Sequence, residues 1–240
     1  MRLDDHRTVI TGAGRDFGRS LAISLAALGA EVYLSARSPE AAERVRDEIR
    51  RDGGKAHAFA CDLGVPESIA DFAAAVAERT DRIDVLVNNG APYLAAADLG
   101  DADDERIAET VAAGATGTVL AVKHFLPLLL ASEKPDIVTM VSACGETGHH
   151  RSEAHEAFYA AKSAQAGFTE ILSKRLRPKG VRVISLYPPD FDNPDRNAEE
   201  WTAERDAGDE LSARSLVDCI VFAISQPRDC FIKSFHFEQR

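Results

Sequence analysis

The sequence has 240 residues, of which 45% are hydrophobic, and it carries a formal net charge of −11 at pH 7. This length and apolar content can supply the core of one large α/β domain, while the negative charge disfavours nucleic acid as a partner. The four cysteines show no C-x-x-C pair, and we expect neither a disulfide framework nor a metal site. We find no signal-peptide core and no apolar run of about 20 residues, which predicts a soluble, cytoplasmic protein that binds no membrane.

The first structural signal is a β-branched run at residues 7–11 that ends in a glycine-rich turn. The turn reads Thr-Gly-Ala-Gly-Arg-Asp-Phe-Gly over residues 11–18, and Leu21, Leu25 and Leu28 follow it at helical spacing. We therefore expect a strand, a tight loop and a helix. Because the N-terminus of a helix favours an anion and glycines allow close approach to the backbone, this stretch predicts a phosphate-binding loop.

Strand-like and helix-like segments alternate along the rest of the chain. The expected strands are 31–38, 56–63, 83–87, 136–142, 181–187 and 230–237. The expected helices are 38–49, 66–79, 104–130 with a kink at Pro127, 157–176 and 211–225. A polar stretch at about 190–210 is expected to form an irregular, mobile flap at the strand ends. The alternation predicts one Rossmann-type domain over residues 1–240, a doubly wound parallel sheet with helices on both faces.

Ligands of such sheets bind beyond the carboxyl ends of the strands, so the residues that end the strands should be neighbours. These are residues 11–18, Arg37, Asp62, 88–90, Ser142 and 187–189. Their order and spacing resemble the short-chain dehydrogenase/reductase family over nearly the whole chain. The resemblance implies hydride transfer between a nicotinamide cofactor and a carbonyl or alcohol of a small molecule. It also implies a homodimer or homotetramer.

The glycine loop is similar to the family's Thr-Gly-x-x-x-Gly-x-Gly motif, with one departure. Thr11, Gly12 and Gly18 match, whereas Asp16 replaces the middle glycine and brings a carboxylate near the expected pyrophosphate. Arg15 and Arg37 stand where guanidinium groups suit a 2′-phosphate, which favours NADP(H) over NAD(H). The resemblance implies that the cofactor is bound by Gly12, Gly14, Arg15, Phe17, Gly18, Arg37, Asp62, Leu63, Asn88, Gly90 and Lys162.

The resemblance also implies a catalytic serine, tyrosine, lysine and asparagine, and two of these positions are altered. Ser142 and Lys162 fit the serine and the lysine, but Phe158 occupies the tyrosine position and Gly114 the asparagine position. Tyr159, one residue out of register, is a candidate substitute acid. The loop before it supplies further candidates with pKa values near neutrality, namely His149, His150 and His155. We thus predict Ser142, Tyr159 and Lys162 as the catalytic residues.

Three functions remain open at this point. The first is an NADP(H)-dependent oxidoreductase, which Arg15, Arg37, Ser142 and Lys162 favour. The second keeps the fold and uses the histidine loop as acid and base for a non-redox lyase, dehydratase or cyclase reaction. The third is a non-catalytic binding or subunit-partner protein that retains the dinucleotide groove. Asp16, Phe158 and Gly114 favour the second and the third.

Overall fold

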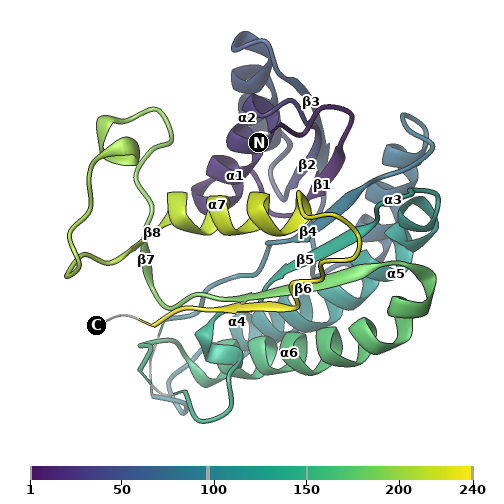
Figure 1. Cartoon of the computed structure of the whole chain (residues 1–240). Coiled ribbons are helices and arrows are strands. Elements are labelled where there is room, and N and C mark those ends of the chain that lie inside the picture. The colour runs from purple at the N-terminus through teal and green to yellow at the C-terminus, as the bar shows by residue number, and fades with distance from the viewer. Residues whose placement is uncertain (1, 96–97, 150, 239–240) are drawn as a thin grey trace.

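A computed structural model describes residues 2–95, 98–149 and 151–238 of the chain. Within these residues, seven parallel strands form one sheet in the order β3-β2-β1-β4-β5-β6-β9 (Figure 1). The strands are β1 Arg7–Ile10, β2 Glu31–Ala36, β3 Lys55–Ala60, β4 Val85–Asn88, β5 Asp136–Met140, β6 Arg182–Tyr187 and β9 Ser234–His236. The strand order reverses between β1 and β4, which confirms the predicted doubly wound sheet.

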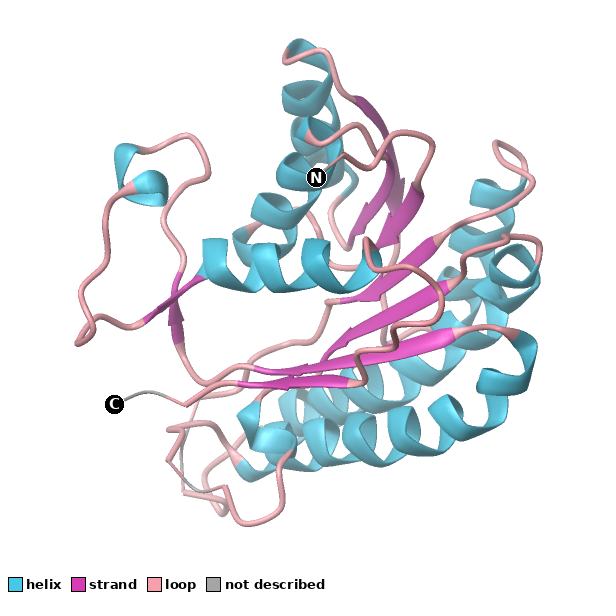
Figure 2. Ribbon diagram, viewed as in Figure 1, coloured by secondary structure: helices cyan, strands magenta, loops and turns pink. Residues whose placement is uncertain are grey.

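Helices cover both faces of the sheet, as Figure 2 shows. One face is covered by α1 Asp16–Ala27, α2 Pro39–Arg51 and α7 Ala213–Ile224, and the other by α3 Pro66–Ala77, α5 Gly117–Leu130 and α6 Glu156–Leu176. Each layer buries its own apolar cluster against the strands, which are therefore apolar on both sides. The arrangement leaves the carboxyl ends of β1, β4, β5 and β6 as the place where loops from different elements meet.

The expected helix over 104–130 is interrupted. It consists of α4 Asp104–Val111, a π-helical turn Ala112–Thr116, and α5, so the irregularity surrounds Gly114, while Pro127 lies inside α5. Among the described residues, the span Asp104–Leu130 is long and apolar enough to cross a membrane by length and composition alone, a test that the core helix of a soluble protein also passes. In this fold Phe125 and Leu129 of the span are completely buried in the core against the sheet.

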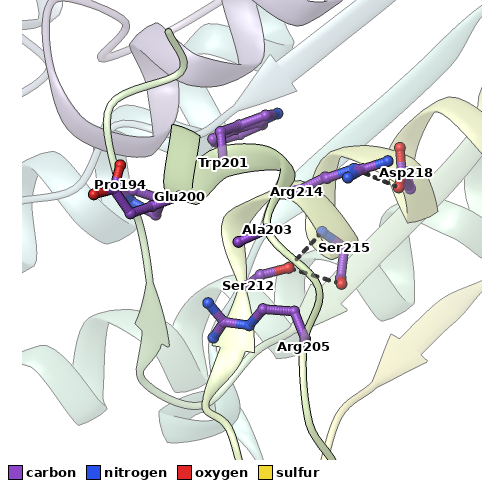
Figure 3. A pocket seen from close by; sticks show the side chains of 9 residues that line it. All are labelled: Pro194, Glu200, Trp201, Ala203, Arg205, Ser212, Arg214, Ser215 and Asp218. Carbon is purple, nitrogen blue, oxygen red and sulfur yellow. Dashed lines mark hydrogen bonds and ion pairs between the residues drawn. The ribbon is translucent and has the colours of Figure 1, made fainter. Parts of the chain in front are cut away.

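The segment after β6 is more ordered than the irregular flap that we predicted. It contains β7 Phe191–Asp192 paired with β8 Leu211–Ser212, and a 3-10 turn Glu199–Thr202 that buries Trp201 to 5% exposure. A cavity of about 220 Å³ lies between this segment and the start of α7, where the Ser212 hydroxyl accepts the N–H of Ser215 (Figure 3). The segment is held against α1 and α2 by the ion pair of Asp195 with Arg19 and by the hydrogen bonds of Arg196 to Ser24 and of Asn197 to Glu48.

Candidate functional site

A cavity of about 300 Å³ lies at the strand ends. Of the predicted residues, the structure brings Phe17 from the start of α1, Ser142 after β5 and Lys162 from α6 to its wall. Residues 188–191, after β6, form the opposite wall. Elements far apart in the sequence therefore meet in one cavity beside the glycine loop.

The glycine loop is held by the end of β4. A Cβ on Gly12, whose φ is +65°, would lie 2.5 Å from the Cα of Gly90, and one on Gly18 would lie 2.4 Å from the carbonyl oxygen of Gly12. The Asn89 side-chain amide donates to the carbonyls of Thr11 and Gly12, each at 3.1 Å. Glycine is therefore required here by packing, and Asn89, which we did not include among the site residues, fixes the loop.

The loop keeps its shape although Asp16 replaces a glycine. Asp16 has φ +49°, in the left-handed region, and its exposed carboxylate lies 3.4 Å from the Nε of Arg15. No side chain caps α1, so its first N–H groups are available to an anion. Arg37 is exposed and forms an ion pair with Glu109. This donor set fits a dinucleotide phosphate, with Arg15 offsetting the charge of Asp16.

The remaining predicted cofactor residues have structural contacts of their own. Gly14 packs against β2, where an added Cβ would lie 2.7 Å from the Cβ of Ala36. Asp62 accepts the N–H of Gly64 at 2.8 Å and so shapes the turn after β3, and Leu63 packs beside Gly90. Asn88 is buried and donates to the hydroxyl of Thr139. Their contacts to a cofactor remain predictions.

Ser142 has an unusual backbone conformation. Its φ of +81° and ψ of 151° lie in a region that almost only glycine adopts. The conformation is held by the N–H of Ser142, which donates to the carbonyl of Leu186 at 3.1 Å, while the hydroxyl accepts the N–H of Cys144 at 3.3 Å. Such strain persists where the surroundings enforce it, and it is frequent at functional sites.

Lys162 is buried beneath the cavity. Its ammonium donates to the carbonyl of Met140 at 2.7 Å and to the side-chain oxygen of Gln165 at 3.1 Å. Burial lowers the pKa of Lys162 to about 8, and the nearby Cys144 thiol opposes this shift. Since an ammonium has three donors, these two bonds leave one for a ligand.

Phe158 occupies the place next to Lys162 that the family motif gives to tyrosine. The centre of its ring lies 5.3 Å from the Lys162 ammonium and 5.2 Å from the ring of Tyr93, edge to face. The neighbouring Tyr159 instead uses its hydroxyl to donate to the Ser152 carbonyl and to accept the Ser152 N–H, at 3.2 and 3.3 Å. Tyr159 is absent from the residues that line the cavity.

This geometry speaks against the predicted role of Tyr159 as proton donor. One step along an α-helix rotates a side chain by about 100°, and here that rotation points the phenol of Tyr159 at the loop before α6. Burial also raises its pKa. In this structure the Tyr159 hydroxyl anchors the loop through Ser152, which itself lines the cavity, and its role as proton donor stays a prediction.

The loop histidines differ in position. His149 lines an adjoining cavity of about 340 Å³ that also contacts Ser142. His155 is 1% exposed, and its Nδ1 accepts the N–H of Ala157 at 3.0 Å, so it caps α6 instead of acting as the predicted acid. His150 lies outside the described residues. Among the three candidates, only His149 is placed beside Ser142 by the described structure.

Two further polar residues of this site were missed. Tyr93 lines the cavity from the segment after β4, and no helical or strand periodicity in the sequence connects it to α6. Gln165 bonds Lys162 from one turn further along α6, and the i, i+3 spacing of these polar residues was a signal that could have found it.

Residues 6–205 match the short chain dehydrogenase family, and the chain belongs to it. The chain is 32% identical to an uncharacterized oxidoreductase of Mycobacterium tuberculosis over 78% of this chain and 70% of that protein. It is 26% identical to an uncharacterized oxidoreductase of Staphylococcus saprophyticus over 95% and 94% of the two chains. A metagenomic short-chain oxidoreductase, solved in complex with NADP, superposes with a TM-score of 0.81 at 27% identity, covering 98% and 96%. The family resemblance read from the sequence is confirmed.

Proposed function

We propose that this protein is an NADP(H)-dependent oxidoreductase that interconverts a carbonyl and an alcohol of a small molecule. The observation that carries this proposal is that Ser142 and Lys162 line one cavity with Phe17, directly beside the glycine loop. Arg15 and Arg37 support the preference for the 2′-phosphate, as does the NADP held by the metagenomic relative. We further propose a soluble, cytoplasmic, single-domain enzyme that forms a homo-oligomer.

Each polar group of the cavity has a role in this proposal. The Ser142 hydroxyl donates a hydrogen bond to the substrate oxygen and polarises the carbonyl. The Lys162 ammonium binds the hydroxyls of the nicotinamide ribose with its remaining donor. A bound nicotinamide supplies the hydride in reduction and accepts it in oxidation.

The proton needs a source other than α6, and we infer that the catalytic set of the family is altered here. Among the described residues that line the cavity, Tyr93 supplies the one phenol. In reduction the carbonyl carbon gains hydride while its oxygen takes the proton of the Tyr93 hydroxyl, which solvent then restores because the side chain is half exposed. Partial burial raises the pKa of Tyr93 above its ordinary value, so the phenol is protonated at neutral pH and donates its proton less readily than a free tyrosine does.

Phe158 supports a second candidate function. Its ring places an apolar surface over Lys162 where a hydroxyl would complete the family's site. A cavity built this way suits a non-redox reaction, with the adjoining loop of His149 as acid and base, or a binding role without turnover. The two candidates differ in whether the bound cofactor is oxidised.

The test is a fluorescence titration of the purified protein with NADPH and with NADH, followed by NADPH oxidation against a panel of ketones and aldehydes. We expect tighter binding of NADPH and turnover of at least one carbonyl. Tyr93→Phe should lower kcat by about 10²-fold or more because the general acid is lost. The matched control, Tyr159→Phe, removes a phenol outside the cavity and should keep kcat within about twofold.

If neither cofactor binds, hydride transfer is the wrong function. If NADPH binds but is never oxidised, the second candidate replaces the first. Equal effects of the two tyrosine variants would remove Tyr93 as the proton donor while leaving the cofactor assignment in place.

A further inference from the structure

A fully buried polar network lies beneath Lys162, on α6 and the π-helical turn. Gln165 is 2% exposed, and its amide nitrogen donates to the Gly114 carbonyl and to the Thr118 hydroxyl, both at 2.8 Å. The Thr118 hydroxyl in turn donates to the same Gly114 carbonyl at 2.8 Å. Because the oxygen of Gln165 accepts from Lys162, one side chain connects the ammonium to the turn.

The π-helical turn is the part of the α4–α5 segment that Gln165 contacts. Within it the N–H of Gly117 donates to the carbonyl of Ala112, an i→i+5 bond. The carbonyl of Gly114, in the middle of the turn, accepts hydrogen bonds from the side chains of Gln165 and Thr118.

The glycine at 114 also sets the distance between the two helices. A Cβ added to Gly114 would lie 2.9 Å from the Cβ of Ala161, closer than real contacts allow. The missing side chain therefore lets α6 approach the turn closely enough for Gln165 to reach the carbonyl. The lack of a side chain at position 114 thus permits the hydrogen bond that the Gln165 amide makes to the turn.

We propose that Gln165 is a positioning residue that substitutes for the missing asparagine side chain of position 114 by fixing the Lys162 ammonium to the π-helical turn. The amide suits this task because its oxygen accepts from the cation while its nitrogen donates to the carbonyl. Removing the amide leaves a buried ammonium with one acceptor fewer and a buried carbonyl with one donor fewer. The proposed link to cofactor binding rests on the function proposed above.

Lys162 reports directly on this arrangement. The titratable groups that line the cavity with it are Cys144 after β5, Tyr93 after β4 and Asp190 after β6, and none of these belongs to the Gln165 network. A change at Gln165 therefore alters the proton affinity of Lys162 through the hydrogen bond itself. Whether the proton affinity of Lys162 rises or falls depends on the group that replaces the amide oxygen.

The experiment is an NMR titration of Lys162 in protein labelled at the lysine ε-carbon, assigned with Lys162→Met, together with NADPH binding by fluorescence. Gln165→Met removes the acceptor, and we expect the proton affinity of Lys162 to fall about tenfold, one pH unit. Gln165→Glu puts a carboxylate against the ammonium and should raise it. Thr169→Val deletes a buried hydroxyl on α6 that donates to the backbone carbonyl of Gln165 and accepts from Ser185, without bonding the Gln165 amide or Lys162, and it should leave the titration unchanged.

Gln165→Met should also weaken NADPH binding about tenfold, while Thr169→Val should not. An unchanged Lys162 titration in both Gln165 variants, with melting temperatures near that of the parent, would overturn the proposal. If Gln165→Met does not fold, the Gln165→Glu variant tests the proposal: a raised proton affinity of Lys162 supports it, and an unchanged one overturns it. If the parent protein binds no NADPH, the proposed function fails, yet the titration of Lys162 still tests the role of Gln165.

Discussion

The two ends of the strand-end cavity keep the family pattern in different ways. At the glycine loop the binding groups are backbone N–H groups, and Asp16 preserves the loop by adopting φ +49°, with its side chain in solvent. At the end that holds Lys162, the proposed chemistry depends on a hydroxyl, and Phe158, which we match to the tyrosine of the family motif, places a ring without a hydroxyl beside the ammonium. A site built from backbone groups therefore tolerates a changed side chain. A site built from side chains changes its chemistry when one of them is replaced.

Phe158→Tyr is the variant with the largest expected effect on the difference between the two ends of the cavity. The new hydroxyl would extend from a ring whose centre lies 5.3 Å from the Lys162 ammonium, and restoring a general acid contributes about 10²–10⁴-fold. Because Tyr93 already supplies a general acid in the proposed mechanism, we expect kcat for carbonyl reduction by NADPH to rise by no more than about 10²-fold, measured at saturating cofactor. An unchanged kcat, with NADPH still bound, would show that the chemistry at this end is limited by something other than the missing hydroxyl.

Arg37→Ala tests the cofactor end. A charge-assisted hydrogen bond to phosphate contributes about 1.5–3 kcal/mol, so the dissociation constant of NADPH should rise roughly 10- to 100-fold. NADH lacks the 2′-phosphate, and its binding should stay within about twofold. Arg44→Ala on α2 removes another exposed arginine and serves as the matched control. Equal losses for NADPH and NADH would show that Arg37 does not read the phosphate.

The pH dependence of NADPH binding tests the role of Lys162, to which we assign contact with the nicotinamide ribose. Burial lowers the pKa of Lys162 to about 8, so the ammonium is present below that pH and is lost above it. NADPH affinity should therefore decline above pH 8, by at most about tenfold per unit, and Lys162→Met should flatten the profile in fluorescence titrations. The unfolded chain binds this proton more tightly, so the contribution of Lys162 to folding stability rises with pH between about 8 and 10.5. A parent profile that is flat up to pH 9.5 would contradict the assignment.

Asp16→Gly has the smallest expected effect. Glycine adopts φ +49° freely, and the substitution removes an exposed, screened carboxylate from the expected pyrophosphate site. We expect NADPH to bind about two- to fivefold more tightly, with a slightly higher melting temperature. Weaker binding would mean that Asp16 contributes a contact of its own to the cofactor.

Most of the fold could be predicted because it depends on local patterns. Apolar periodicity located the strands and helices, and the spacing of Gly12 and Gly18 located the loop, where an added Cβ would meet neighbouring backbone. The family assignment followed from the order of these motifs. The interrupted helix was not foreseen, because the turn around Gly114 is contacted by Gln165, which lies 51 residues away in the sequence.

The catalytic end could be predicted only in part. Sequence register placed Ser142 and Lys162 correctly in one cavity, but it could not decide whether Tyr159 or Phe158 faces Lys162. That choice depends on the rotation of α6, which buries Phe158 and Lys162 on the same packed face and leaves the Tyr159 hydroxyl to bond the backbone of Ser152. Tyr93 reaches the cavity through a contact between segments, which no periodicity within one segment encodes.

At Ser142 the strained backbone conformation lowers the stability of the fold at a position whose hydroxyl we assign to catalysis. Glycine would adopt φ +81° without penalty, so Ser142→Gly should make the protein harder to unfold while removing the hydroxyl that we propose polarises the substrate. A serine at so strained a position thus supports the proposed use of its hydroxyl.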